Sequence, residues 1–101
     1  MKRILLVCSA GMSTSLLVSK MQIAAEKQNI ECSISATAEA ELKEHVDKTD
    51  VILIGPQVRF LLSKIKASVE SKSIPVEIIN AVDYGTMNGE KVLKQALDLI
   101  K

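Results

Sequence analysis

The sequence has almost no aromatic residues: Phe60 and Tyr84 are the only two among 101, and tryptophan is absent. Stacking on aromatic side chains is therefore a poor way for this chain to hold nucleic-acid bases or a flavin ring. Thirteen Lys and Arg nearly balance twelve Asp and Glu, for a net charge of +1. The strongly basic face that a nucleic-acid-binding protein needs is therefore not expected.

Long apolar segments are missing too. The longest run, residues 4–8, is far shorter than the ~20 residues of a membrane-spanning helix, and too brief for a secretory signal peptide. We therefore expect a cytoplasmic protein, in which a reducing environment keeps Cys8 and Cys32 as thiols. The hydrophobic fraction of 48% and the charged fraction of 25% are typical of a folded domain and exclude a disordered chain.

Short apolar segments alternate with segments of helical periodicity along the whole chain. The expected strands span residues 3–7, 31–36, 50–54 and 75–79, and the expected helices span 13–28, 39–46, 57–71 and 89 onward. This alternation predicts a single-domain α/β fold, with a four-stranded parallel sheet and helices on both faces. Right-handed crossovers favour the flavodoxin-like strand order 2-1-3-4, with the alternating segment 31–36 at an edge.

Cys8 directly follows the first expected strand. In the order 2-1-3-4, the ligand crevice lies at the carboxyl ends of strands one and three, so Cys8 and the loops 55–57 and 80–88 face it. A loop containing a glycine and four hydroxyl residues, leading into a helix, can turn its N–H groups inward as an anion nest. This predicts a thiolate nucleophile that accepts a phosphoryl group. The predicted phosphate cradle comprises Ser9, Ala10, Gly11, Met12, Ser13, Thr14 and Ser15.

Other readings of these residues stay open. A cysteine after a strand is also often a small buried hydrophobe. Cys32 lies on the apolar side of its strand, near the start, so it is expected to be structural and too far from Cys8 for a disulfide. His45, the only histidine, lies in a charged stretch and is expected to be solvated.

Three residues of the two later loops are candidates for a second shell around the phosphate. Gln57 either caps its helix or touches the phosphate, and capping is the simpler expectation. Tyr84 either reaches the phosphate with its hydroxyl or covers the loop. Asp83 either supplies an acid or is a solvated loop residue.

The run of residues 8–21, Cys-Ser-Ala-Gly-Met-Ser-Thr-Ser-Leu-Leu-Val-Ser-Lys-Met, resembles the IIB component of bacterial sugar phosphotransferase systems, lactose/cellobiose class. Gly55-Pro56-Gln57 and Asp83-Tyr84-Gly85 also look like segments of this family. The resemblance covers residues 1–101 as one IIB domain. It implies that Cys8 takes a phosphoryl group from a phosphohistidine on IIA. It also implies that Cys8 passes the group to a sugar, such as cellobiose or another β-linked disaccharide, held by the membrane component IIC. By the same resemblance, no metal or organic cofactor is expected at the site.

The loop also resembles those of low-molecular-weight tyrosine phosphatases and arsenate reductases. Those enzymes place an arginine six positions after the nucleophile, to clamp the phosphate, whereas this chain has Thr14 there. Without the guanidinium, hydrolysis is expected to be slow, which suits a carrier. A flavodoxin-like binding module is the third alternative. No large exposed apolar stripe is evident, so a monomer is expected.

Overall fold

Four parallel strands form one sheet in the computed structural model, which describes residues 1–8 and 12–100. The strands are β1 (Lys2–Cys8), β2 (Cys32–Ala38), β3 (Val51–Ile54) and β4 (Val76–Ile78). Their order is β2-β1-β3-β4, and all three neighbouring pairs are parallel. The predicted fold class and strand order are confirmed, including the position of β2 at an edge.

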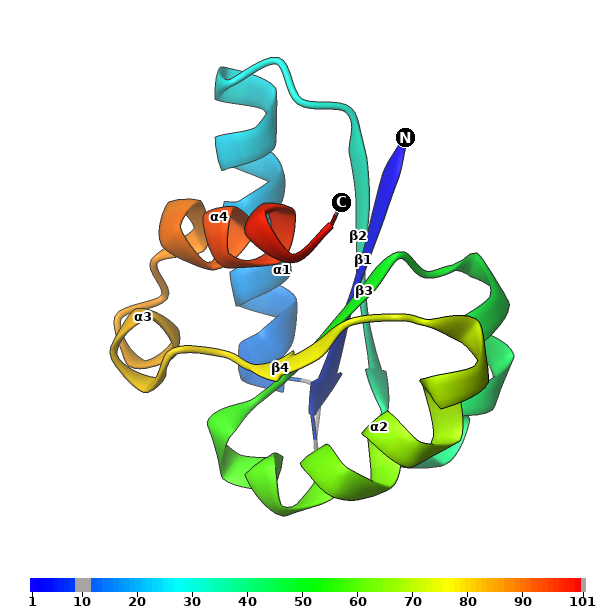
Figure 1. Cartoon of the computed structure of the whole chain (residues 1–101). Helices are drawn as coiled ribbons and strands as arrows, with labels where there is room; N and C mark the ends of the chain where they lie inside the picture. Colours follow the sequence, from blue (N-terminus) through cyan, green and yellow to red (C-terminus); the bar gives the residue numbers. More distant parts are fainter. Residues whose placement is uncertain (9–11, 101) are drawn as a thin grey trace.

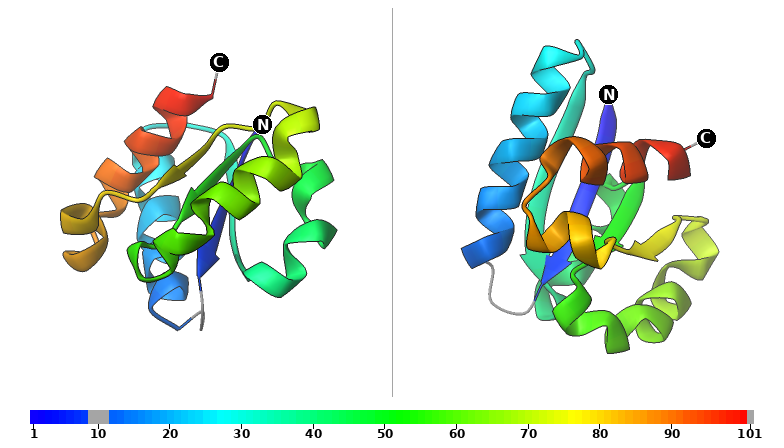
Figure 2. Two further views of the ribbon diagram at one scale, coloured as in Figure 1. Left: turned by 60° about the horizontal axis from the view of Figure 1, so that its bottom comes forward. Right: turned by 90° about the vertical axis from the view of Figure 1, so that its left-hand side faces the viewer.

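Helices cover both faces of the sheet, as Figures 1 and 2 show. On one face, α1 (Met12–Lys27) packs against α4 (Gly89–Leu99), with the short α3 (Ala81–Gly85) beside them. The other face carries α2 (Leu62–Val69) and four 3₁₀ helices: η1 (Glu39–Glu44), η2 (Val46–Lys48), η3 (Pro56–Leu61) and η4 (Glu70–Lys72). Two separate apolar layers result, one on each side of the sheet.

The central strand β1 is buried on both faces. Ile4 and Leu6 belong to the layer under α1 and α4, whereas Leu5 and Val7 belong to the layer under α2. Side chains of a strand alternate between the two faces, so a strand covered twice is apolar at every position. By the same alternation, Cys8 lies on the α1 side of the sheet.

The outer edge of β4 is covered by one side chain of α4. Gln95 donates from Nε2 to the Ile78 carbonyl (2.8 Å) and accepts at Oε1 from the Asn80 N–H (3.1 Å). The N–H of Ile79, between them, donates inward to β3 at 2.9 Å. The Ile78 carbonyl and the Asn80 N–H therefore point away from β3, where a further strand would bind them. Because Gln95 already pairs both groups, this edge of the sheet is protected.

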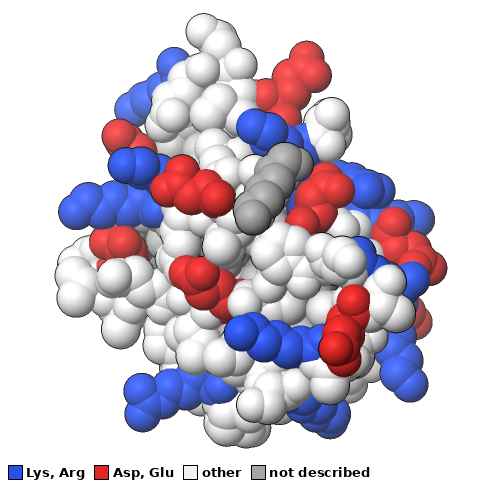
Figure 3. Space-filling model, viewed as in Figure 1, with Lys and Arg blue, Asp and Glu red and all other residues white. Residues whose placement is uncertain are grey.

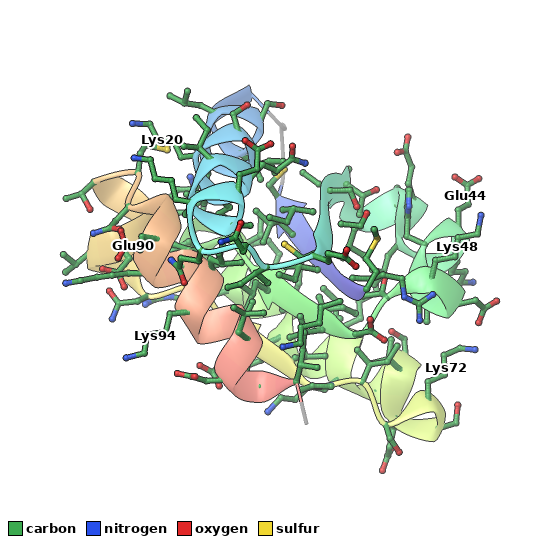
Figure 4. All side chains as sticks on the ribbon, turned by 90° about the horizontal axis from the view of Figure 1, so that it is seen from above. Lys20, Glu44, Lys48, Lys72, Glu90 and Lys94 are labelled. Carbon is green, nitrogen blue, oxygen red and sulfur yellow. The ribbon has the colours of Figure 1, made fainter. Side chains whose placement is uncertain are left out.

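Charges of both signs are mixed over the surface. On the face drawn in Figure 3, Lys and Arg alternate with Asp and Glu, and neither sign forms a broad patch. Figure 4 shows labelled charged side chains pointing outward from both helical layers: Lys20, Glu90 and Lys94 on one, and Glu44, Lys48 and Lys72 on the other. Within residues 1–8 and 12–100, no helix has the length and apolar character needed to cross a membrane.

Two expectations about the helices need correction. The segment expected as a helix over 39–46 is 3₁₀ rather than α-helical, and the segment expected over 57–71 is α-helical only in α2, with a 3₁₀ helix on either side. In η3 the buried, β-branched Val58 has φ −119° and ψ 28°, which interrupts the helix.

The second correction concerns the loop expected over residues 80–88, which contains α3. The Asn80 side chain caps this helix by accepting from the N–H groups of Val82 (2.9 Å) and Asp83 (3.2 Å). A helix this short shows no apolar periodicity, so the pattern missed it.

Candidate active site

Cys8 ends β1 at the point where the strand order reverses. It is paired with Ala38 of β2, and on its other side the Gly55 N–H, just after β3, donates to the carbonyl of Val7 at 2.9 Å. Cys8 is 5% exposed, and its thiol donates a hydrogen bond to the carbonyl oxygen of Thr37 at 3.9 Å. The structure therefore places Cys8 at the carboxyl end of β1, as the strand order predicts, while its role as a nucleophile stays a prediction.

The helix α1 begins at Met12, four residues after Cys8, and Figure 1 shows its start near the tip of β1. A helix N-terminus carries unpaired N–H groups and a positive partial charge, both of which favour a nearby anion. Of the predicted cradle, Ser9, Ala10 and Gly11 lie outside the described residues, as do the side chains of Met12 and Ser13. The cradle itself thus stays a prediction.

The remaining two cradle candidates lie in the first turn of α1 and differ in burial. Thr14 is only 1% exposed, and its Oγ1 lies 3.5 Å from the phenol oxygen of Tyr84. Ser15 is exposed, and its carbonyl accepts a hydrogen bond from Ser19 Oγ at 3.3 Å. The Thr14 hydroxyl therefore faces the inside of the protein, toward α3, whereas Ser15 lies on the surface.

Gln57 and Tyr84 are brought together although 27 positions separate them in the chain. The Gln57 amide nitrogen donates to the Tyr84 phenol oxygen at 3.0 Å, and Tyr84 is 8% exposed. No side-chain hydrogen bond caps the start of η3. The expectation that Gln57 caps its helix is therefore wrong: its amide instead satisfies a buried hydroxyl, which is costly to leave unpaired.

Gly55 makes room for this pair. A Cβ at Gly55 would lie 3.0 Å from Gln57 Oε1, 3.8 Å from Tyr84 Cε1 and 3.5 Å from the carbonyl oxygen of Val7. A side chain here would crowd Gln57 between β1 and the tyrosine ring. The same distances place the Tyr84 ring and the Gln57 amide near Val7, the residue that precedes Cys8.

The other second-shell candidate, Asp83, lies elsewhere. It is half-buried and lines a groove along the outer edge of β4, together with Lys91 and Lys94 of α4. The structure thus groups Thr14, Gln57 and Tyr84 and leaves Asp83 at the side.

The second cysteine is at the opposite end of the sheet. Cys32 pairs with Lys2, six register positions from Cys8, which is about 20 Å along the strands. Both cysteines are free, as expected. Burial raises the pKa of the Cys32 thiol, and the charge of Lys2 partly offsets this rise. Cys32 is therefore less readily ionised than an ordinary cysteine and far from the crevice.

Arg3 and His45 also lie away from Cys8. The Arg3 guanidinium binds the Asp50 carboxylate through two contacts of 3.2 Å at the amino ends of β1 and β3. The carbonyl of the half-buried His45 accepts from Thr49 Oγ1 at 2.7 Å, just before β3 begins. Within residues 1–8 and 12–100, no cluster of three or more His, Cys, Asp or Glu side chains is arranged to hold a metal ion.

Three large apolar side chains that the sequence analysis did not select surround this end of the sheet. Leu16, Phe60 and Val82 are 52%, 76% and 72% exposed, in the segments that follow β1, β3 and β4. Each segment begins at the carboxyl end of its strand, so the three exposed side chains lie toward the same end of the sheet as Cys8. An apolar residue off the buried side of its helix is the signal that could have found them.

Comparison with known proteins gives concordant matches. The pattern of one family, described as "PTS system, Lactose/Cellobiose specific IIB subunit", matches residues 3–95. The chain is 45% identical over 100 residues to the oligo-beta-mannoside-specific EIIB component of Bacillus subtilis (strain 168), covering 99% of this chain and 97% of that protein. It is 42% identical over 104 residues to the galactose-specific EIIB component of Lactococcus lactis subsp. cremoris (strain MG1363), covering 98% and 96%.

A solved structure agrees with these sequence matches. The solution structure of the cellobiose-specific phosphotransferase IIB component protein from Borrelia burgdorferi is 50% identical, with a TM-score of 0.82. The alignment covers 98% of this chain and 91% of that one. Sequence and fold therefore match over almost the same length.

Proposed function

Because the chain belongs to the family of lactose/cellobiose-specific IIB subunits of phosphotransferase systems, we propose that it carries a phosphoryl group on Cys8 during sugar uptake. IIB components act as phosphotransferases together with IIA and IIC components. The observation that carries the proposal is the position of the Cys8 sulfur, at the carboxyl end of β1 and one short loop before α1. There a helix N-terminus favours both a thiolate and a phosphate.

The proposed chemistry has two steps on one sulfur. First, the Cys8 thiolate forms a bond to phosphorus as the bond from phosphorus to a histidine nitrogen of IIA breaks, and that nitrogen keeps the electron pair. Then a hydroxyl oxygen of the sugar on IIC attacks phosphorus and loses its proton to water. Cys8 leaves as a thiolate and is ready for another cycle. Backbone N–H groups of residues 9–15 would hold the phosphate oxygens in both steps.

The residue six positions after Cys8 supports a carrier over a phosphatase. A phosphatase loop of this kind has an arginine six residues after the nucleophile, where this chain has the buried Thr14. Arg3 is bound to Asp50 at the other end of β1. A phosphocysteine without a guanidinium clamp should hydrolyse slowly, and a carrier needs this because it must diffuse from one partner to the next.

For the sugar, we propose a β-linked disaccharide such as cellobiose. The similar proteins carry the names of different sugars, oligo-β-mannoside, galactose and cellobiose, as expected if IIC selects the sugar. We also propose that residues 1–101 act as one IIB domain, as a monomer in the cytoplasm. Gln57 and Tyr84 would support the phosphate site from behind, and Asp83 would lie at its margin.

The test is the intact mass of the protein after incubation with phosphorylated IIA. The wild type and Cys32→Ser, the matched control, should each gain one phosphoryl group, while Cys8→Ser gains none and keeps the wild-type circular dichroism spectrum. Membranes containing IIC and cellobiose should then remove the group. An adduct on Cys8→Ser, or none on the wild type, would overturn the carrier proposal. Rapid turnover of an aryl phosphate would favour the phosphatase instead.

A further inference from the structure

Three segments that follow the strands of this sheet are joined at one phenol oxygen. Tyr84, in α3 after β4, accepts a hydrogen bond from Gln57 in η3, and its oxygen lies 3.5 Å from the hydroxyl of Thr14 in α1. Tyr84 and Thr14 are both buried, at 8% and 1% exposure. The residue at this junction is the only tyrosine of the chain, and Thr14 lies in the first turn of the helix that follows the Cys8 loop.

We propose that Tyr84 is a positioning residue for phosphoryl transfer, which acts by holding the first turn of α1 in place through Thr14. This inference rests on the proposed function and assigns Tyr84 no contact with the phosphate. The N–H groups of that turn are part of the predicted cradle, so their place relative to the Cys8 sulfur determines how well the transition state is stabilised. Even a 1 Å displacement of such groups can cost about a hundredfold in rate.

The donor and acceptor chemistry of the pair supports this role. An amide nitrogen can only donate, so the phenol oxygen is the acceptor in the bond from Gln57. At 3.5 Å, the contact with Thr14 is longer than an ordinary O–H···O hydrogen bond. The contact with Tyr84 alone therefore orients the Thr14 side chain only weakly. The shorter hydrogen bond from Gln57, at 3.0 Å, holds the phenol oxygen in its position beside the Thr14 hydroxyl.

The close packing at Gly55 makes the arrangement rigid. A Cβ there would already be in contact with Gln57 Oε1 and the Tyr84 ring, so this corner has no spare space. The ring also packs in the apolar layer of α1 and α4. Because loss of the ring would damage the fold, the informative substitution is Tyr84→Phe, which removes the hydroxyl alone.

The experiment is a double-mutant cycle on transfer from phosphorylated IIA. Tyr84→Phe, Thr14→Val and the double variant are compared for the transfer rate at saturating donor, for the half-saturating donor concentration and for Tm. Each single variant should transfer about tenfold more slowly, equivalent to roughly 1.4 kcal/mol, with the donor concentration dependence unchanged. The double variant should be no slower than the slower single one, because both remove the same contact.

Conservative and distant variants separate positioning from stability. Thr14→Ser keeps the hydroxyl and should recover most of the rate that Thr14→Val loses. Thr49→Val removes another buried threonine hydroxyl, bonded to the His45 carbonyl at the opposite end of the sheet. It should lower Tm without slowing transfer.

Three results would overturn the inference. One is a wild-type transfer rate in Tyr84→Phe, another is rate losses that multiply in the double variant, and the third is an equal rate loss in Thr49→Val. Failure of the proposed function is visible separately, since Cys8→Ser would then still accept the phosphoryl group, or the wild type would accept none.

Discussion

Gly89 is the residue at which α4 meets the backbone of α1. A Cβ at this position would lie 2.5 Å from the Lys20 carbonyl carbon and 2.7 Å from both the Lys20 carbonyl oxygen and the Met21 nitrogen. Nonbonded carbon atoms prefer separations of about 3.5–4.0 Å. All three neighbours are backbone atoms of a helix and have no rotamer to change, so Gly89→Ala forces α4 to withdraw by roughly 1 Å.

The cost of this withdrawal follows from the apolar layer that α1 and α4 close. Overpacking of a well-packed core costs roughly 1–3 kcal/mol. The better helix propensity of alanine returns at most about 1 kcal/mol, and less at the first residue of a helix. We therefore expect Gly89→Ala to destabilise the fold by about 1–2 kcal/mol, which lowers Tm by roughly 5–15 °C for a domain of this size.

The assay is thermal unfolding followed by circular dichroism, with a urea titration of the same samples. Gly85→Ala is the matched control, because a Cβ at Gly85 would have no heavy atom within 4 Å. It should keep the wild-type Tm or raise it slightly. If Gly89→Ala is as stable as Gly85→Ala, the proximity of the two helix backbones does not constrain this position and the packing argument is wrong.

Three further substitutions test other parts of the structure. Hydrogen bonds from the Arg3 side chain hold the pKa of the Asp50 carboxyl below its usual range, and burial partly opposes this shift. The Asp50 carboxylate therefore stabilises the fold above about pH 4, and this stabilisation is lost as the pH falls through the folded-state pKa. In urea unfolding, Asp50→Asn should thus lower the free energy of unfolding by about 1 kcal/mol at pH 7 and by progressively less toward pH 2. A difference between variant and wild type that does not change with pH would contradict this. Gln95→Leu should uncover the β4 edge and cause concentration-dependent association in sedimentation, whereas a strictly monomeric variant would show that Gln95 does not protect it. If the 76% exposed Phe60 contacts IIA, Phe60→Ser should raise the half-saturating concentration of phosphorylated IIA several-fold at an unchanged maximal rate, and an unchanged half-saturating concentration would show that it makes no such contact.

Much of the architecture could be predicted, because a strand that is buried on both faces of a sheet is apolar at every position. The runs at residues 4–8 and 51–54 are apolar throughout, and connectivity rules then leave few strand orders. The position of Cys8 follows from that order alone, because a residue directly after the first strand must lie at the switch point.

The contacts within the site were less predictable, since they depend on how segments distant in the chain approach each other. Whether Gln57 caps η3 or binds Tyr84 is determined by the space at Gly55, which no local pattern reports. The inward-facing Thr14 shows the same limit: its row of hydroxyl residues predicts a phosphate cradle, but it does not predict the contact of the Thr14 side chain with Tyr84 of α3. Short helices such as α3 are determined by a cap and by tertiary packing rather than by periodicity.

The most direct test of the central claim is an NMR measurement on the protein before and after phosphorylation by IIA. We expect a phosphorus resonance characteristic of a thiophosphate ester, together with the largest backbone amide shifts at residues 9–15. A phosphoramidate resonance from His45, or amide shifts centred away from the segment that follows Cys8, would contradict it.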